Sequence, residues 1–244
     1  MIPLLLSLVT FGSTLLGGLF ALHRRRQLHL VMGFAAGILV GAALLDLLPE
    51  ALDLAAAMPG AAASVVFRGA VLGFLVFYGL DRTMHLLAAG HADSHASPHA
   101  AGAFGTAAAL GLTIHSFLDG FAIGSGFRAA TAIGILVAIA VIAHDFGDGV
   151  STVAVVLGAK GSTRASLGWL AADALAPVAG AAAATLLAIP PGFLVGVLGF
   201  FAGSFLFIGA AHLLPEAGRE GHGVALPLAV VAGFAFIALV TQVV

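Results

Sequence analysis

The chain has 244 residues, of which 61% are hydrophobic and only 8% are charged, and its net charge is −2. A soluble domain carries about 25% charged residues, so this composition predicts a polytopic membrane protein with little mass outside the lipid bilayer. The weak negative charge argues against a nucleic-acid partner, and the lack of cysteine excludes disulfides and thiolate metal sites.

Eight segments are long and apolar enough to cross a bilayer as helices, which takes about 20 residues each. They lie at residues 2–22, 28–50, 62–84, 103–126, 131–158, 163–189, 193–215 and 224–243. The sequence therefore predicts an all-α, multi-pass protein of the cell (inner) membrane, with residues 1–244 forming a single transmembrane domain.

Basic residues fall mainly in alternate connections between these segments. Seven of the nine lysines and arginines lie there, at Arg24, Arg25, Arg26, Arg82, Lys160, Arg164 and Arg219. By the positive-inside rule we expect these connections in the cytoplasm and both chain termini outside.

The connection at residues 85–102 would then be cytoplasmic, and it carries His91, His95 and His99. Three histidines at this spacing could capture metal. The Ala, Ser and Gly residues around them are also typical of a passive, flexible linker. Both interpretations stay open.

A motif in the second segment recurs 166 residues later in the seventh. Residues 33–37 read GFAAG and residues 47–51 read LLPEA, and the second copy reads GFFAG at 199–203 and LLPEA at 213–217. On the orientation above, the two copies run in opposite directions. This predicts an inverted repeat, with helices one to three and six to eight flanking helices four and five in a 3+2+3 arrangement suited to alternating access. Chance similarity between two helices rich in Gly and Leu is the alternative.

The fourth and fifth segments each place a histidine four residues before an aspartate, as His115 with Asp119 and His144 with Asp148. Residues four apart share one face of a helix. Two such faces opposite each other make a site of nitrogen and oxygen ligands that suits a divalent metal. An aspartate at mid-membrane costs about 2.5–3.5 kcal/mol on insertion scales, and a bound cation would offset that cost.

Three more aspartates fall within the predicted spans, at Asp46, Asp145 and Asp173, and no Lys or Arg lies near mid-membrane to neutralise them. Such carboxyl groups must be protonated, hydrogen-bonded to neighbouring helices or paired with a cation. Asp46 could line the outer path to the site. His212 and Glu216 share a face at the inner end of the seventh helix, where they would line the exit path or form a solvated helix end.

The two central motifs resemble those of a known family. Residues 115–124 read HSFLDGFAIG, similar to the HNFxDGxAIG signature of the ZIP (Zrt/Irt-like) divalent-metal transporters, and HDFGDG at 144–149 resembles their HExPEG-type motif. The resemblance implies a prokaryotic-type ZIP protein that carries a divalent cation into the cytoplasm. Zinc is the first candidate, before iron, manganese and cadmium. The metal would be a transported substrate and not a cofactor, and a homodimer is a common family habit.

Carried over by position, the resemblance implies a principal metal site at His115, Asp119, His144 and Asp148. It also implies a neighbouring site at Ser116 and Asp145. Ser116 stands where the family usually has Asn, and Ala176 stands where it has Glu, although Asp173 lies one turn earlier and could compensate. We therefore expect one full-strength metal site and a weak or altered second one.

Two other function classes fit the same residues. A metal held by two histidines and two aspartates within the membrane could activate water, as in an intramembrane metal-dependent hydrolase. Hydrolysis, however, does not need the alternating access that an inverted repeat provides. The other class is a proton-coupled carrier of a different cationic solute, with the histidines as relays.

Overall fold

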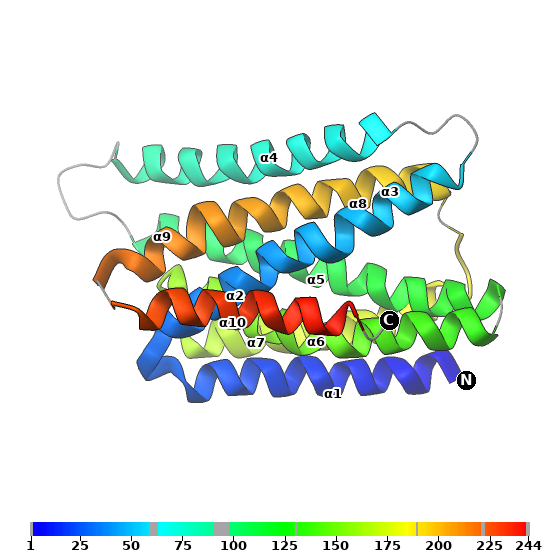
Figure 1. Cartoon of the computed structure of the whole chain (residues 1–244). Helices are drawn as coiled ribbons and strands as arrows, with labels where there is room; N and C mark the ends of the chain where they lie inside the picture. The colour runs from blue at the N-terminus through cyan, green and yellow to red at the C-terminus, as the bar shows by residue number, and fades with distance from the viewer. Residues whose placement is uncertain are drawn as a thin grey trace.

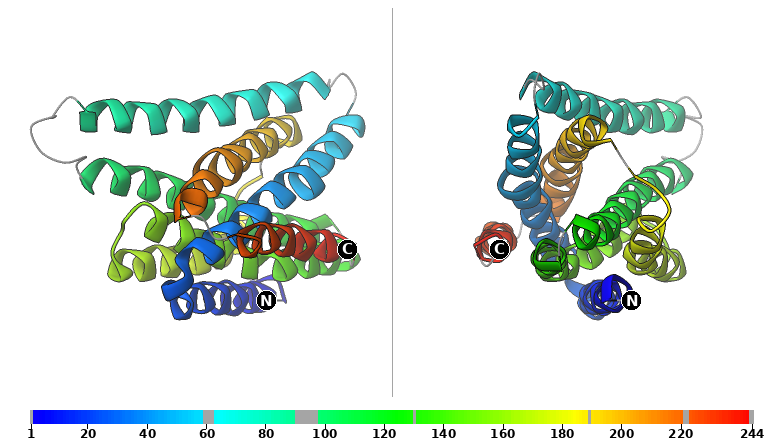
Figure 2. Two further views of the ribbon diagram at one scale, coloured as in Figure 1. Left: turned by 60° about the vertical axis from the view of Figure 1, so that its left-hand side comes forward. Right: turned by 90° about the vertical axis from the view of Figure 1, so that its right-hand side faces the viewer.

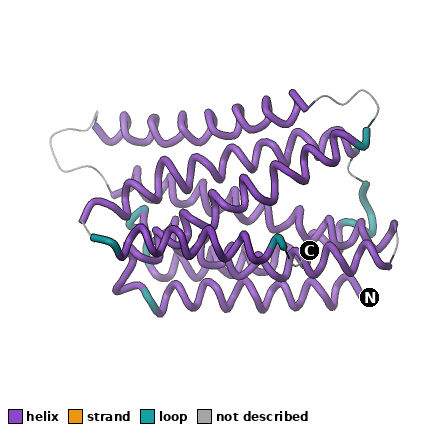
Figure 3. Tube along the Cα trace, in the orientation of Figure 1, coloured by secondary structure: helices purple, strands orange, loops and turns teal. Residues whose placement is uncertain are grey.

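The computed structural model describes residues 2–58, 63–89, 98–129, 131–188, 190–220 and 223–242. Within these ranges the chain forms helices joined by short turns and contains no strand (Figure 3). The helices run along a common direction and form one elongated bundle (Figure 1). The predicted all-α class is confirmed.

Eight helical segments follow the predicted spans, and two of them are composed of several shorter helices. They are α1 (Ile2–His23), η1 with α2, η2 and α3 (Arg25–Gln27, Leu28–Ala42, Ala43–Leu47 and Leu48–Ala56), α4 (Ala63–Ala89), α5 (Pro98–Ala129), α6 (Thr131–Gly158), α7 (Thr163–Ala183), α8 with η3, α9 and η4 (Pro191–Leu206, Phe207–Leu213, Leu214–Ala217 and Gly218–Glu220), and α10 (Ala225–Val240). Among the described residues, seven segments have the length and hydropathy needed to cross a membrane, and α10 is apolar but only 16 residues long.

The structure differs from the predicted boundaries at two connections. Helix α7 ends at Ala183 and not at 189, because Arg128 of α5 donates hydrogen bonds to the carbonyl oxygens of Ala184 and Leu187, at 2.7 and 2.9 Å. The predicted connection at 85–102 is shorter, since α4 continues to Ala89 and α5 begins at Pro98. His91 and His95 lie outside the described residues, and the side chain of His99 in α5 is likewise outside them.

Both chain termini lie at the same end of the bundle (Figure 1). Helix α2 runs toward that end and α8 runs away from it, so the two copies of the repeated motif are antiparallel (Figure 1). This is the arrangement that an inverted repeat requires.

Each copy of the repeat contains one π-helical turn, η2 in the first and η3 in the second. The N–H of Leu48 donates to the carbonyl of Ala43, and the N–H of Leu214 donates to that of Gly209, each five residues back. A proline follows in each LLPEA sequence. Because proline has no N–H and its ring displaces the carbonyl group four residues earlier, the helix widens locally at this point.

Glycines set the closest helix crossings. A Cβ atom at Gly120 of α5 would overlap the carbonyl oxygen of Pro177, and one at Gly180 of α7 would overlap that of Phe117. Three other helix pairs meet through reciprocal glycines in the same way: Gly17 and Gly149 (α1 and α6), Gly37 and Gly233 (α2 and α10), and Gly73 and Gly203 (α4 and α8). Small residues let backbones approach where lipid supplies no hydrophobic drive between helices.

The helices pack in two groups. Helices α1, α5, α6 and α7 pack mainly against one another, whereas α2 packs on α10 and α4 packs on α8 (Figure 2). Both histidine motifs belong to the first group. Gly120 and Gly149 each follow an aspartate of these motifs, so the tight crossings of α5 with α7 and of α6 with α1 fix the backbone beside each aspartate.

The glycine crossings predict a sharp contrast between two alanine substitutions. Gly149→Ala would drive a methyl group into the backbone of α1 and should lower stability by about 1–3 kcal/mol, as overpacking does. Gly79→Ala in α4 is the control, since nothing lies within 4 Å of its Cβ position; it should leave stability unchanged or slightly improved. Thermal unfolding of the purified variants in one detergent measures both, and equal melting temperatures would contradict the packing role.

The positive-inside rule predicts that the end of the bundle with both termini faces away from the cytoplasm. Because the chain has no cysteine, single introduced cysteines can report sidedness directly. A cysteine at the exposed Gly192, near the start of α8, should react with an impermeant maleimide added outside intact cells. A cysteine at the exposed Ala165, in the first turn of α7, should react only after the membrane is opened. Labelling of both from one side would overturn the orientation.

Candidate metal site

Helices α5 and α6 bring together the four residues of the predicted principal site. One ligand atom from each of His115, Asp119, His144 and Asp148 lies within 4.8 Å of the others, and no other such group occurs in the described part of the chain. Asp119 Oδ2 is 3.4 Å from His115 Nε2 and 3.5 Å from His144 Nε2. His144 Nε2 is also 3.9 Å from Asp148 Oδ2. Two imidazole nitrogens and two carboxylate oxygens form a donor set that suits Zn²⁺ and related cations.

These four side chains are largely shielded from solvent, and Asp119, the most exposed of them, shows only 14% of its side chain. Several of their polar atoms make no hydrogen bond within the described structure: His115 Nδ1, Asp119 Oδ2, His144 Nε2 and Asp148 Oδ2. Buried polar atoms without partners are unfavourable, and most proteins avoid them. Three of these atoms, Asp119 Oδ2, His144 Nε2 and Asp148 Oδ2, are the same atoms that approach one another in the site, so the residues present fit a bound cation.

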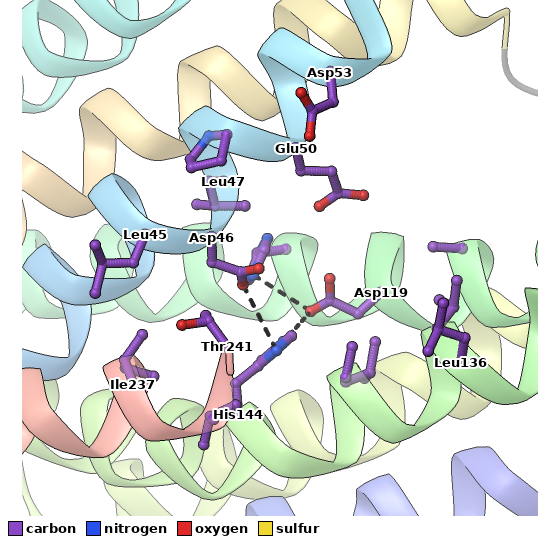
Figure 4. A pocket seen from close by; sticks show the side chains of 17 residues that line it. Leu45, Asp46, Leu47, Glu50, Asp53, Asp119, Leu136, His144, Ile237 and Thr241 are labelled. Atoms are coloured by element: carbon purple, nitrogen blue, oxygen red, sulfur yellow. Dashed lines mark ion pairs between the residues drawn. The ribbon is translucent and has the colours of Figure 1, made fainter. Parts of the chain in front are cut away.

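A cavity of about 480 Å³ leads to the site from the end of the bundle that holds the termini. Asp119 and His144 face it from one side, and an acidic face of α2 to α3 lines the other (Figure 4). That face carries Asp46, Glu50 and Asp53, at helical spacings of four and three residues. Carboxylates along the approach attract cations toward the metal site.

The opposite side of the site is closed by aromatic rings. His115 packs against the buried rings of Phe201 and Phe205, with ring centroids 5.5 and 5.0 Å apart. Farther along η3, His212 Nδ1 lies 3.2 Å from Asp81 Oδ1 of α4, and its ring lies against Phe104 at 4.0 Å.

The structure places the other predicted pathway residues at different depths. Asp46 lines the cavity. His212 is paired with Asp81, a partner that no sequence pattern indicated. Glu216 forms an ion pair with Arg219 at 2.9 Å, so it lies at a helix end and does not line the cavity.

Two residues of the predicted second site, Ser116 and Asp173, contact each other directly. Asp173 accepts hydrogen bonds on both oxygens, from the hydroxyl groups of Ser116 and Thr152, each at 2.8 Å. All three side chains are fully buried or nearly so. Asp145 is also fully buried, on the side of α6 that faces α1, and neither of its carboxylate oxygens makes a hydrogen bond within the described structure. The sequence analysis missed Thr152, although it follows Asp148 by four residues on the same helix.

Comparison with known proteins agrees with this architecture. Residues 1–108 match the family model described as ZIP Zinc transporter. The chain is 26% identical over 226 residues to the zinc transporter ZupT of Escherichia fergusonii, covering 88% of this chain and 86% of that one. It is 25% identical to ZupT of Salmonella newport, with the same coverage, and 25% identical to ZupT of Salmonella heidelberg, covering 89% and 87%. With its apolar membrane-length helices, the chain is a multi-pass membrane protein, and its sequence is similar to ZIP zinc transporters of the prokaryotic type.

Proposed function

We propose that this chain carries divalent metal cations, zinc foremost, across the membrane into the cytoplasm, and that the ion is held in passage by His115, Asp119, His144 and Asp148. The observation that carries the proposal is the convergence of two histidines and two aspartates at the inner end of an acidic cavity. Relatives named as zinc transporters support zinc as the transported substrate. The similarity to zinc transporters supports a transporter over the membrane-embedded hydrolase that the residues alone left open.

Alternating access is the mechanism that we propose for this transport. The cavity reaches the site from the end with the termini, which the positive-inside rule assigns to the outside, while aromatic rings close the other side. This combination supports an outward-open arrangement. An inverted repeat supplies the means for an equivalent opening on the cytoplasmic side, because its two halves can exchange conformations around one central site.

We further propose that each chain holds one ion at a time. Asp173 already accepts two hydroxyl hydrogen bonds, and the serine that donates one of them stands where a stronger ligand would be needed. Asp145 lies apart on the α1 side of α6. The second cluster therefore acts as a hydrogen-bonded brace between α5, α6 and α7, and not as a second metal site.

Transport is the most direct test. The purified chain in proteoliposomes should accumulate labelled Zn²⁺ in a time-dependent, saturable way, above the leak of protein-free liposomes. Asp119→Asn and Asp148→Asn should each abolish accumulation, since each removes a charged ligand from a site that has four. Uptake of Zn²⁺ by both variants at the rate of the parent would refute the proposed site. A chain that moves only protons or an organic cation would refute the proposed substrate.

Zinc stoichiometry separates the two clusters. The parent chain should bind one Zn²⁺ per protomer after desalting, measured by mass spectrometry of the metal. Asp119→Asn and Asp148→Asn should weaken Zn²⁺ binding by more than about 100-fold. Loss of a group that only supports a metal ligand costs up to about 100-fold, and loss of a ligand should cost more. Asp145→Asn and Asp173→Asn are the matched controls and should keep one ion. Asparagine is used because an unpaired buried charge would itself destabilise the bundle. Two bound ions in the parent, falling to one in Asp173→Asn, would show a working second site.

A further inference from the structure

The imidazole of His144 has different surroundings at its two nitrogens. Nε2 faces the metal site, 3.5 Å from Asp119 and 3.9 Å from Asp148. Nδ1, on a different edge of the ring, lies 3.8 Å from Asp46 Oδ2 (Figure 4). Asp46 therefore approaches a different edge of the imidazole from Asp119 and Asp148, although it lines the same cavity as Asp119.

This placement matters for coordination by imidazole. A neutral imidazole can offer a lone pair at only one nitrogen, and the other nitrogen carries the hydrogen. A carboxylate that accepts that hydrogen fixes the tautomer and the ring orientation and makes the ligand nitrogen more basic. Asp46 stands where it can do this for Nε2 of His144. The 3.8 Å separation is about 0.9 Å longer than a typical N–H···O bond. Asp46 is one-third exposed in the cavity, which leaves its carboxylate room to turn toward Nδ1.

The other histidine of the site lacks such support. Nδ1 of His115 is buried and makes no hydrogen bond in the described structure, and its ring is held by contacts with Phe201 and Phe205. Packing orients His115, whereas a carboxylate faces the far nitrogen of His144. The two histidine ligands are therefore not equivalent.

The π-helical turn explains why Asp46 reaches this position. Asp46 lies inside η2, where the widened helix shifts the side-chain directions that a regular α-helix would give. The equivalent residue of the second repeat, 166 positions later, is His212 in η3. His212 likewise forms a carboxylate–imidazole pair, with Asp81 at 3.2 Å. Both π turns thus direct a polar side chain toward a partner of opposite type on another helix.

We infer that Asp46 is a positioning residue for the metal site: it accepts the Nδ1 hydrogen of His144 and so holds Nε2 ready to bind the ion. The inference rests on the proposed metal site at His144. This role differs from the attraction of cations into the cavity. Attraction depends only on the negative charge of Asp46, whereas positioning depends on its contact with Nδ1 of His144.

Four variants separate these roles. Asp46→Leu removes both the charge and the acceptor, whereas Asp46→Asn removes the charge but keeps an amide oxygen as an acceptor. Asp53→Leu and Asp53→Asn are the matched controls, because Asp53 lines the same cavity on the same helical face but has no contact with His144. The probe is Zn²⁺ binding to the purified full chain, measured by competition with a chelating dye, and thermal unfolding checks that each variant is folded.

Asp46→Leu should weaken Zn²⁺ binding by about 10–100-fold, as loss of groups that support metal ligands does, and Asp46→Asn should show a smaller loss. The two Asp53 variants should resemble each other and change binding by well under tenfold. In a His144→Ala background, Asp46→Leu should have no further effect, because the nitrogen it acts through is gone. Zinc-loaded protein with ¹⁵N-labelled histidine should show a slowly exchanging Nδ1 proton that His144→Ala and Asp46→Leu both lose.

Failure of this inference is distinguishable from failure of the metal site itself. If the parent binds no Zn²⁺, or Asp119→Asn binds it normally, the proposed site is wrong. A second set of results would overturn only the positioning role. In it, the parent binds Zn²⁺ and Asp119→Asn does not, but Asp46→Leu lowers Zn²⁺ affinity no more than Asp53→Leu does, or lowers it equally in the His144→Ala background. Asp46 would then act only through its charge. If Asp46→Leu does not fold, the graded comparison rests on Asp46→Asn, whose binding must then fall below that of Asp53→Asn.

Discussion

Negative charge buried in a membrane is the constraint on which this structure depends. The spans contain aspartates but no lysine or arginine near mid-depth. The surroundings of these carboxylates differ from position to position. Asp119 and Asp148 lie beside two histidines in a donor set that fits a cation. Asp173 accepts hydrogen bonds from two hydroxyl groups, and Asp46 is partly exposed in the cavity beside an imidazole. Among the described residues, buried carboxylates meet imidazoles in a donor set that fits a divalent cation at one place only.

Backbone packing makes that place rigid on one side and adjustable on the other. The glycines after Asp119 and Asp148 lock α5 onto α7 and α6 onto α1, so both ligand helices are fixed within one group. Asp46 belongs to η2, the π turn that continues α2 in the other group. If Asp46 supports His144 as we infer, the metal affinity of the site depends on how closely the α2–η2 segment approaches α6. A conformational change that moves these helices apart would then lower the affinity for the ion.

The sequence was sufficient for features that depend on local periodicity. The four-residue spacing from His115 to Asp119 and from His144 to Asp148 predicts shared helix faces, and the repeat predicts antiparallel helices. It was not sufficient where partners come from distant helices. Asp81 beside His212 and the split of Ser116 and Asp173 from Asp145 depend on how helices rotate against one another, which hydropathy does not encode. The early end of α7 depends likewise on an arginine 56 residues away.

The two π turns also bear on how the chain arose. The repeated motif aligns without a gap from residues 33–51 to residues 199–217, straight through both turns. Both turns lie directly before the proline of LLPEA, so the motif and the widened geometry are shared by the two halves. The simplest history is a three-helix ancestor that already carried the widened turn before its gene doubled. The two descendants then diverged in chemistry within an inherited geometry, one keeping a carboxylate and the other an imidazole.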